Sequence, residues 1–312
     1  MIQKISFLLL VFLSFSHNSF SQENHSKRSF KNNTIKTSDG VSLFAKISGK
    51  GDVCIFVHGG PGAWSESFEK LGGNILEDNL TMCYYDQRGC GRSASPTDNN
   101  YSLNRMVEDI EDIRNNLNTP KIFIMGHSFG GILATEYAKK YPEHVKGLIL
   151  LNATLDINYS LRNQISYIGI ITGENITIQN NDSVLNTFFD AKKRLGKTDL
   201  NYKILSDNKT SVEKLDSIDN GFKRNSSFAQ HALKDPVYFN DFTKETTTIK
   251  APTLIISGTK DNNIGPDHYL SFKFPNQDIE IIEGGHLLYY EKNQDFKNSV
   301  QQFVKKTRSK QL

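Results

Sequence analysis

The sequence predicts an α/β protein built on a mostly parallel β-sheet with helices on both faces. Six short apolar runs typical of fully buried strands recur along the 312 residues. Amphipathic segments of helical period separate or follow most of these runs. Strands that alternate with helices favour a parallel sheet, because a parallel neighbour needs a crossover connection. Hydrophobic residues make up 37% of the chain, which is enough for a large core.

The first expected element is a hairpin of residues 33–37 and 41–47, with a turn at residues 38–40 (Ser-Asp-Gly). The buried strands are expected after it, at residues 53–57, 81–85, 121–125, 147–151, 252–257 and 279–282. Helices are expected at residues 64–80, 102–117, 132–141 and 267–272, and in a last segment that ends near Val304.

The alternation of strands and helices stops at about residue 155 and resumes at about residue 249. Asn, Asp, Ser and Lys are frequent in this stretch, and strand-like runs are few. We therefore expect a mostly helical insertion at residues 155–249, within a core made of residues 22–154 and 250–312. Its amphipathic helices are expected at residues 159–165, 184–195 and 222–233.

Residues 1–21 have the pattern of a secretory signal peptide. Lys4 precedes an apolar run at residues 5–15, and small residues follow at Ser19 and Ser21. The apolar run is short for a transmembrane helix. We expect cleavage after Ser21 and a periplasmic or secreted mature chain without a membrane span. An uncleaved membrane anchor is the alternative.

Charge and cysteine content exclude several classes of function. The net charge is +3, and the basic residues are spread along the chain, so no nucleic-acid surface is expected. The three cysteines form no C-x-x-C pair, and no Cys and His residues have metal-binding spacing. We expect neither a metal site nor a disulfide framework. The cysteines are Cys54, Cys83 and Cys90.

Residues 126–130 read Gly-His-Ser-Phe-Gly between an apolar run and a helical pattern. On a sharp strand-to-helix turn this spacing places Ser128 in a strained backbone conformation with its Oγ exposed. Side chains at positions 126 and 130 would collide with their surroundings. The helix N-terminus behind the serine stabilises negative charge. Ser128 is therefore the candidate nucleophile, and the alternative is a glycine-rich turn whose serine only caps the helix.

Residues 58–62, which read His-Gly-Gly-Pro-Gly, directly follow the first buried strand. Glycines allow backbone N–H groups to point into a cavity. We expect the N–H groups of Gly60 and Phe129 to form an oxyanion hole, with Gly59 as the alternative to Gly60. A tight turn before the next helix is the alternative interpretation of this loop.

Asp86, Arg88 and Arg92 follow the second buried strand and are close enough in sequence to form one rigid ion-pair cluster. We expect this cluster to shape the rim of the site. A catalytic role for Asp86 is the alternative, although Asp86 precedes the serine in the chain.

Two further residues complete a candidate catalytic triad. Asp261 comes just after the fifth buried strand, and His286 just after the sixth. Functional groups of parallel sheets gather at the carboxyl ends of the strands. His286 would take the proton of Ser128, and Asp261 would orient the imidazole. Asp156, after the fourth strand, is the alternative acid.

From about residue 30 to residue 306 the chain resembles the α/β-hydrolase fold, and two loops resemble those of proline iminopeptidases. These loops are residues 58–62 and residues 86–93, which read Asp-Gln-Arg-Gly-Cys-Gly-Arg-Ser. The resemblance implies a triad of Ser128, Asp261 and His286, no cofactor, and a helical cap whose carboxylates bind the free amine of the substrate. The acids of the insertion include Glu174, Asp182, Asp190, Asp216, Asp219 and Asp235.

The resemblance implies a serine hydrolase that acts by acyl transfer on a small amide or ester, as an aminopeptidase of the proline iminopeptidase type. A carboxylesterase or lactonase is the alternative, because such enzymes share the Gly-His-Ser-Phe-Gly-Gly turn. A binding protein that kept the fold is the alternative outside enzymes. Epoxide hydrolases and haloalkane dehalogenases use an aspartate nucleophile, which Ser128 disfavours. The expected partner is a small molecule or short peptide, and the oligomeric state is not indicated.

Overall fold

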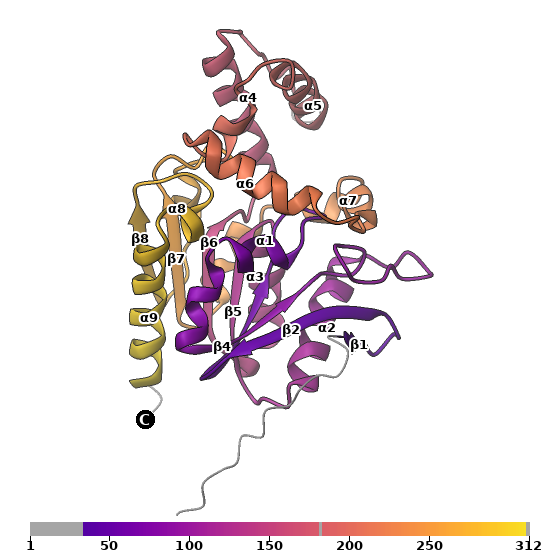
Figure 1. The fold of residues 1–312 in the computed structure, drawn as a ribbon, viewed down its shortest axis with the longest axis vertical. Coiled ribbons are helices and arrows are strands. Elements are labelled where there is room, and N and C mark those ends of the chain that lie inside the picture. Colours follow the sequence, from indigo (N-terminus) through magenta and orange to yellow (C-terminus); the bar gives the residue numbers. More distant parts are fainter. Residues whose placement is uncertain (1–33, 181–182, 310–312) are drawn as a thin grey trace, which may run out of the picture. The chain divides into compact units, whose positions relative to one another are not determined.

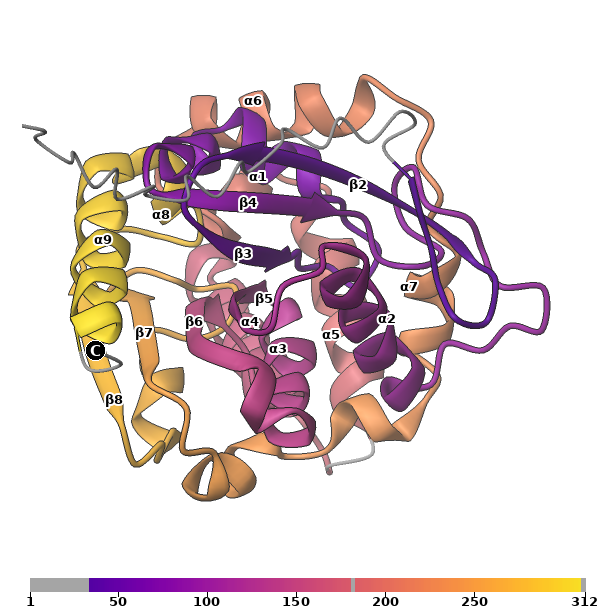
Figure 2. The ribbon, with the colours of Figure 1, turned by 90° about the horizontal axis from the view of Figure 1, so that it is seen from below.

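The computed structural model describes residues 34–180 and 183–309. Its strands are β1 (Thr34–Lys36), β2 (Ser42–Gly49), β3 (Asp52–Val57), β4 (Leu80–Tyr85), β5 (Ile122–Ser128), β6 (Val145–Ala153), β7 (Thr253–Gly258) and β8 (Gln277–Ile282). They form one sheet in the order β1-β2-β4-β3-β5-β6-β7-β8 (Figures 1 and 2). β1 pairs antiparallel with β2, and β2 pairs antiparallel with β4. The other neighbours run parallel, which confirms the predicted mostly parallel sheet.

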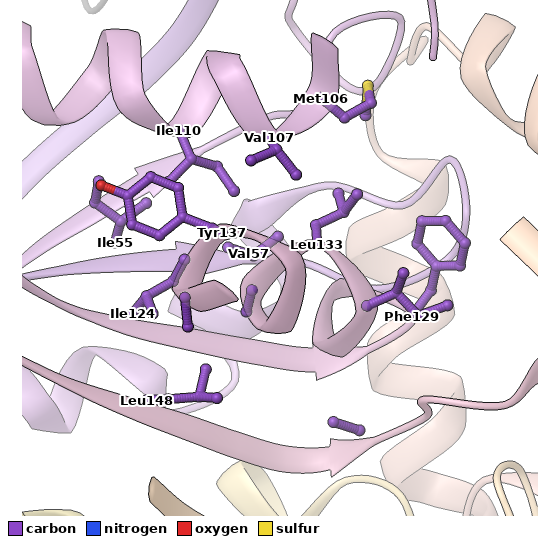
Figure 3. Packing of buried hydrophobic residues seen from close by; sticks show 14 of the residues in the cluster. Ile55, Val57, Met106, Val107, Ile110, Ile124, Phe129, Leu133, Tyr137 and Leu148 are labelled. Carbon is purple, nitrogen blue, oxygen red and sulfur yellow. The ribbon is translucent and has the colours of Figure 1, made fainter. Parts of the chain in front are cut away.

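Helices cover both faces of the sheet (Figure 2). α2 (Leu103–Asn116) and α3 (Gly130–Lys140) lie on one face. α1 (Ser65–Lys70), α8 (Leu288–Glu291) and α9 (Asn293–Ser309) lie on the other. Figure 3 shows the first face, where Ile110 of α2 and Leu133 of α3 pack over Ile124 of β5. Burial on both faces explains why the central strands read as continuous apolar runs.

Three predicted core helices differ from the structure. The helix expected at residues 64–80 is divided into α1 and a 3₁₀ segment, Gly73–Asp78. The division falls at Gly72, whose φ of 116° is incompatible with a continuous helix. The helix expected at residues 267–272 is a single 3₁₀ turn, His268–Ser271. The last helix, α9, continues past Val304 to Ser309.

The insertion lies beyond the carboxyl ends of the central strands (Figure 1). Its helices are α4 (Ile157–Thr172), α5 (Val184–Leu195), α6 (Lys209–Asn220) and α7 (Ser227–Ala232). The helix predicted at residues 222–233 was wrong in its start, because Asn225 pairs instead with Gly91 in an antiparallel bridge. α6 was missed, although Asn208 is a recognisable N-cap that accepts from two backbone N–H groups.

The predicted signal peptide, residues 1–21, lies outside the described residues. Within residues 34–180 and 183–309, no helix combines the length and apolar character needed to cross a membrane.

The predicted cluster of Asp86, Arg88 and Arg92 divides into two separate ion-pair groups. Only Arg92 pairs with Asp86, at 2.7 Å. The fully buried guanidinium of Arg88 turns away and donates two hydrogen bonds, of 2.7 and 2.6 Å, to Asp109 on α2. It also bonds Asp39 in the β1–β2 turn. Arg88 therefore joins three parts of the fold, and burial raises the pKa of Asp109 in spite of this cation.

Replacing Arg88 should strongly destabilise the protein. In Arg88→Met the carboxylate of Asp109 stays buried without its main partner, so we expect the free energy of unfolding to fall by about 3–5 kcal/mol. Urea unfolding of the purified protein measures this loss. The double variant Arg88→Met/Asp109→Leu should recover most of it, because that buried charge is gone. A loss below about 1 kcal/mol, the range of a surface ion pair, in the single variant would contradict this role of Arg88.

Candidate active site

Ser128 ends β5 with a φ of +53°, which few residues other than glycine adopt. The turn around it is packed too tightly for side chains. A Cβ at position 126 would lie 2.6 Å from the carbonyl oxygen of Gly130, and one at position 130 would lie 2.1 Å from the carbonyl oxygen of Val57. The predicted steric reason for the two glycines is confirmed, and the turn lies directly against the end of β3.

The loop at residues 58–62 follows β3 and contacts the serine. A Cβ at Gly59 would lie 2.7 Å from Cβ of Ser128. His58 Nε2 accepts from the backbone N–H of Gln87 at 2.9 Å, so the ring proton is on Nδ1, which lies 2.9 Å from the carbonyl oxygen of Gly59. Burial lowers the pKa of His58 and favours this neutral ring.

The hydrogen bond from His58 also orients the next peptide. The carbonyl and N–H groups of a trans peptide point in opposite directions, so the N–H of Gly60 points away from His58. In the described part of the chain, neither this N–H nor that of Phe129 has a hydrogen-bond acceptor. This orientation supports Gly60 as the loop donor, and its role in an oxyanion hole stays a prediction.

The structure brings Asp261 and His286 together. Asp261 follows β7, His286 follows β8, and these strands are neighbours. Asp261 is fully buried, and its Oδ2 lies 2.8 Å from Nδ1 of His286. Its Oδ1 accepts from the backbone N–H groups of Asn263 and Ile264, at 3.0 and 3.2 Å. Both carboxylate oxygens are thus fixed, and the imidazole is held with Nδ1 protonated and its lone pair on Nε2.

His127, the residue before Ser128, contacts His286. The rings of His127 and His286 have centroids 4.6 Å apart, and His127 Nε2 lies 3.4 Å from the carbonyl oxygen of His286. Burial, followed by the neighbouring His286, lowers the pKa of His127 well below its ordinary value. A neutral His127 therefore supports the loop that carries His286.

Asn152 is a residue of the site that the sequence did not indicate. It lies in β6 with a φ of +40°. Its side chain donates to the carbonyl oxygen of Gly285 at 3.0 Å and accepts from the N–H of Gly258 at 2.8 Å. One side chain thus ties together the loops that carry Asp261 and His286. Positive φ is not visible in a sequence, and an asparagine inside an apolar run was the only available signal.

The two alternative acids have other roles. Asp156 is the N-cap of α4 and accepts from the N–H of Tyr159. Asp86 accepts from Ser65 and Arg92. Burial alone would raise the pKa of Asp86, but the hydrogen bonds and charge of Arg92 lower it. Neither acid is hydrogen-bonded to His286 in the described part of the chain.

The insertion contacts every loop of the site. The carbonyl oxygen of Leu205 accepts from the N–H of His286 at 2.7 Å. Asn225 exchanges two backbone hydrogen bonds with Gly91. Asp219 accepts from Trp64 Nε1 at 2.7 Å, next to the 58–62 loop. The insertion therefore contacts the loops at the strand ends, and its role as a cap stays a prediction.

The other acids of the cap are placed differently. Glu174 pairs with Arg194 at 3.0 Å. Asp235 accepts from the N–H of Val237. Asp190 is exposed, and Asp182 lies outside the described residues. Partial burial and the like charge of Asp219 raise the pKa of Asp216. Among the described residues, no group of three His, Cys, Asp or Glu side chains is arranged to hold a metal ion.

Comparison with known proteins gives consistent matches. The family model described as alpha/beta hydrolase fold matches residues 52–293. The chain is 41% identical to a proline iminopeptidase of Thermoplasma volcanium over 95 residues, which are 30% of this chain and only 32% of that relative. It is 27% identical to a proline iminopeptidase of Lactobacillus helveticus over 271 residues, which are 80% of this chain and 88% of that relative.

A solved structure supports the same fold. The crystal structure of a proline iminopeptidase-related protein from Thermus thermophilus superposes with a TM-score of 0.73 at 19% sequence identity. The match covers 87% of this chain and 95% of that one. At this identity the likeness concerns the fold.

Changing Asp261 should slow catalysis much more than changing Asp156. We expect Asp261→Asn to lower kcat by roughly 10⁴-fold, because the amide favours the wrong tautomer of His286. Asp156→Asn is a matched control, since asparagine caps a helix as well as aspartate does. Steady-state rates on a short-chain aryl ester measure both. A larger loss in Asp156→Asn would move the acid to the end of β6.

Proposed function

The chain belongs to the alpha/beta hydrolase fold family, and we propose that it is a serine hydrolase whose triad is Ser128, His286 and Asp261. The observation that carries this proposal is the buried Asp261–His286 pair, 2.8 Å apart, beside a serine on a strained turn. A buried carboxylate bonded to Nδ1 leaves Nε2 as the only basic atom of the ring.

The reaction begins with attack of Ser128 Oγ on the carbonyl carbon of the substrate. As the new C–O bond forms, the hydroxyl proton passes to His286 Nε2, and the carbonyl electron pair moves onto the oxygen. Asp261 stabilises the imidazolium. The N–H groups of Gly60 and Phe129 donate to the oxyanion, with Gly59 as the alternative donor.

The tetrahedral intermediate then loses its leaving group. The carbonyl reforms, the bond to the leaving amine or alkoxide breaks, and His286 returns the proton to that group. Water attacks the acyl-Ser128 ester in the same manner, with His286 again as base, and the acid product leaves with Ser128 restored.

For the substrate, we propose an N-terminal proline or similar aminoacyl group, so that the enzyme is an aminopeptidase of the proline iminopeptidase type. The relatives from Thermoplasma volcanium and Lactobacillus helveticus support this proposal. A substrate with a free ammonium needs a carboxylate near it, since an unpaired charge in a closed site is costly. Asp219 lies next to the 58–62 loop but already accepts from Trp64 and Ser67, and Asp216 on the same helix is exposed, so neither is assigned the role in advance of the test.

Carboxylesterase or lactonase activity is the second candidate. The triad and the two loops serve ester and amide substrates equally well, and only the cap distinguishes them. A binding protein that kept the fold is a third candidate. It is disfavoured because no position of the triad is substituted.

A comparison of substrates tests the proposal. We expect prolyl amides to be hydrolysed with a higher kcat/KM than short-chain aryl esters. Neutralising the amine-binding acid should raise KM for the amides and leave the esters nearly unchanged. The variants to compare carry the amide in place of the acid at Glu174, Asp182, Asp190, Asp216, Asp219 and Asp235. In Ser128→Ala, the control, both activities should fall on the order of 10⁶-fold.

Two results would contradict parts of this proposal. The aminopeptidase assignment is contradicted if no acid variant changes the ratio of kcat/KM for amides to kcat/KM for esters by more than about threefold, which is roughly 0.7 kcal/mol. Esterase or lactonase activity is then the favoured function. Retention of more than a few per cent of kcat by Ser128→Ala would show that Ser128 is not the nucleophile.

We also propose that the protein is exported to the periplasm or the medium after cleavage near Ser21. The pattern of residues 1–21 supports this proposal. Intact-mass measurement of the exported protein should give a chain that begins near Gln22. A mass that includes residues 1–21, found in the membrane fraction, would favour the anchor instead.

A further inference from the structure

The proton-accepting atom of the proposed base already has a partner in this structure. Asn263 Nδ2 lies 3.2 Å from Nε2 of His286. Because Nδ1 of the ring faces Asp261, a neutral imidazole has its single lone pair on Nε2, and the amide N–H of Asn263 donates to it. Ser128 Oγ makes no hydrogen bond to any described residue. Asn263 thus bonds to the lone pair that must accept the serine proton in the proposed mechanism.

Cap helix α4 holds the backbone that carries Asn263. Its side chains donate to three successive carbonyl oxygens of the loop after Asp261. Gln164 Nε2 donates to the carbonyl of Asn263 at 2.7 Å. The other two bonds run from Asn163 Nδ2 to Asn262 at 2.9 Å and from Ser160 Oγ to Ile264 at 3.2 Å. The donors occupy one face of the helix, at spacings of three and four residues. A shift of α4 therefore moves Asn263 relative to His286.

We propose that Asn263 is a positioning residue that blocks His286 Nε2 in the resting enzyme and is released when α4 moves. The inference rests on the proposed function. On release, the Asn263 N–H···Nε2 hydrogen bond breaks, and the hydroxyl of Ser128 donates to Nε2 in its place. The proton then transfers as the bond from Oγ to the substrate carbonyl carbon forms. The cap in this way couples substrate binding to activation of the nucleophile.

The side chain of Asn263 can be tested separately from its backbone. Its backbone N–H donates to Asp261 Oδ1, and its carbonyl accepts from Gln164. Both bonds survive any substitution except proline, which lacks the backbone N–H. Asn262 offers a matched control, because the hydrogen bond of its side chain goes to the carbonyl oxygen of Lys260 and not to His286.

The experiment measures how fast a small fluorophosphonate labels Ser128, together with kcat/KM for a short aryl ester. In Asn263→Ala both should rise, by about three- to tenfold, the effect of removing one ordinary hydrogen bond that competes with the reaction. Asn262→Ala should leave both unchanged. If the Asn263 side chain only stabilised its loop, removing it would lower the labelling rate and kcat/KM, and the blocking role would be wrong. The serine side chain in Asn263→Ser is too short to reach Nε2, so this variant should behave as Asn263→Ala does. It is the variant to use if Asn263→Ala does not fold.

A second variant tests the link to the cap. Gln164→Met keeps the shape of the side chain but removes its donor to the Asn263 carbonyl, and it should also raise the labelling rate. Combined with Asn263→Ala it should give no further rise, because both act through the same bond. A fully additive rise would contradict the coupling.

The outcomes separate this inference from the proposed function. If the wild-type protein is labelled at Ser128 but Asn263→Ala and Asn263→Ser are labelled no faster, the blocking role is wrong and the serine hydrolase stands. If the folded wild-type protein is not labelled at Ser128 at all, the proposed function itself fails.

Discussion

The close contact between the Ser128 turn and the end of β3 is the constraint on which the site depends. Gly130 is packed so tightly against the carbonyl oxygen of Val57 that no side chain fits. This contact holds Ser128 at positive φ, a conformation that persists only where its surroundings determine it. The 58–62 loop leaves β3 at the same point, so the strain on the serine and the position of the candidate oxyanion donors have one cause.

The strand order extends this arrangement to the other site residues. β5, β6, β7 and β8 are successive parallel neighbours, so their carboxyl ends lie along one edge of the sheet. Asn152 on β6 connects the loop after β7, which carries Asp261, to the loop after β8, which carries His286. Its side chain is hydrogen-bonded to Gly258 and Gly285. The cap adds hydrogen bonds to the backbone of the loops that carry Asp261 and His286: Gln164 donates to the carbonyl of Asn263, and the N–H of His286 donates to the carbonyl of Leu205. The cap therefore shares in positioning the site as well as in covering it.

Most of the core could be predicted from the sequence, because strands buried on both faces leave continuous apolar runs. The glycines at positions 126 and 130 were also predictable, because their neighbours in the chain define the turn. The positive φ of Gly72 was not visible in the sequence, and the short α7 and the separate partners of Arg88 depend on residues distant in the chain. Asn152 and Asn263 were missed because a polar side chain reveals its partner only when the loops are assembled.

The four histidines around the candidate site differ in their surroundings, and this difference supports the proposal of His286 as the base. Burial lowers the pKa of His58, His127 and His268, so these rings stay neutral. Of the four, only His286 has a carboxylate within hydrogen-bond distance, since Asp261 faces its Nδ1. Burial therefore penalises a positive charge on the other three rings. The neutral rings then serve as fixed hydrogen-bonding supports, as His58 does for the peptide that presents Gly60.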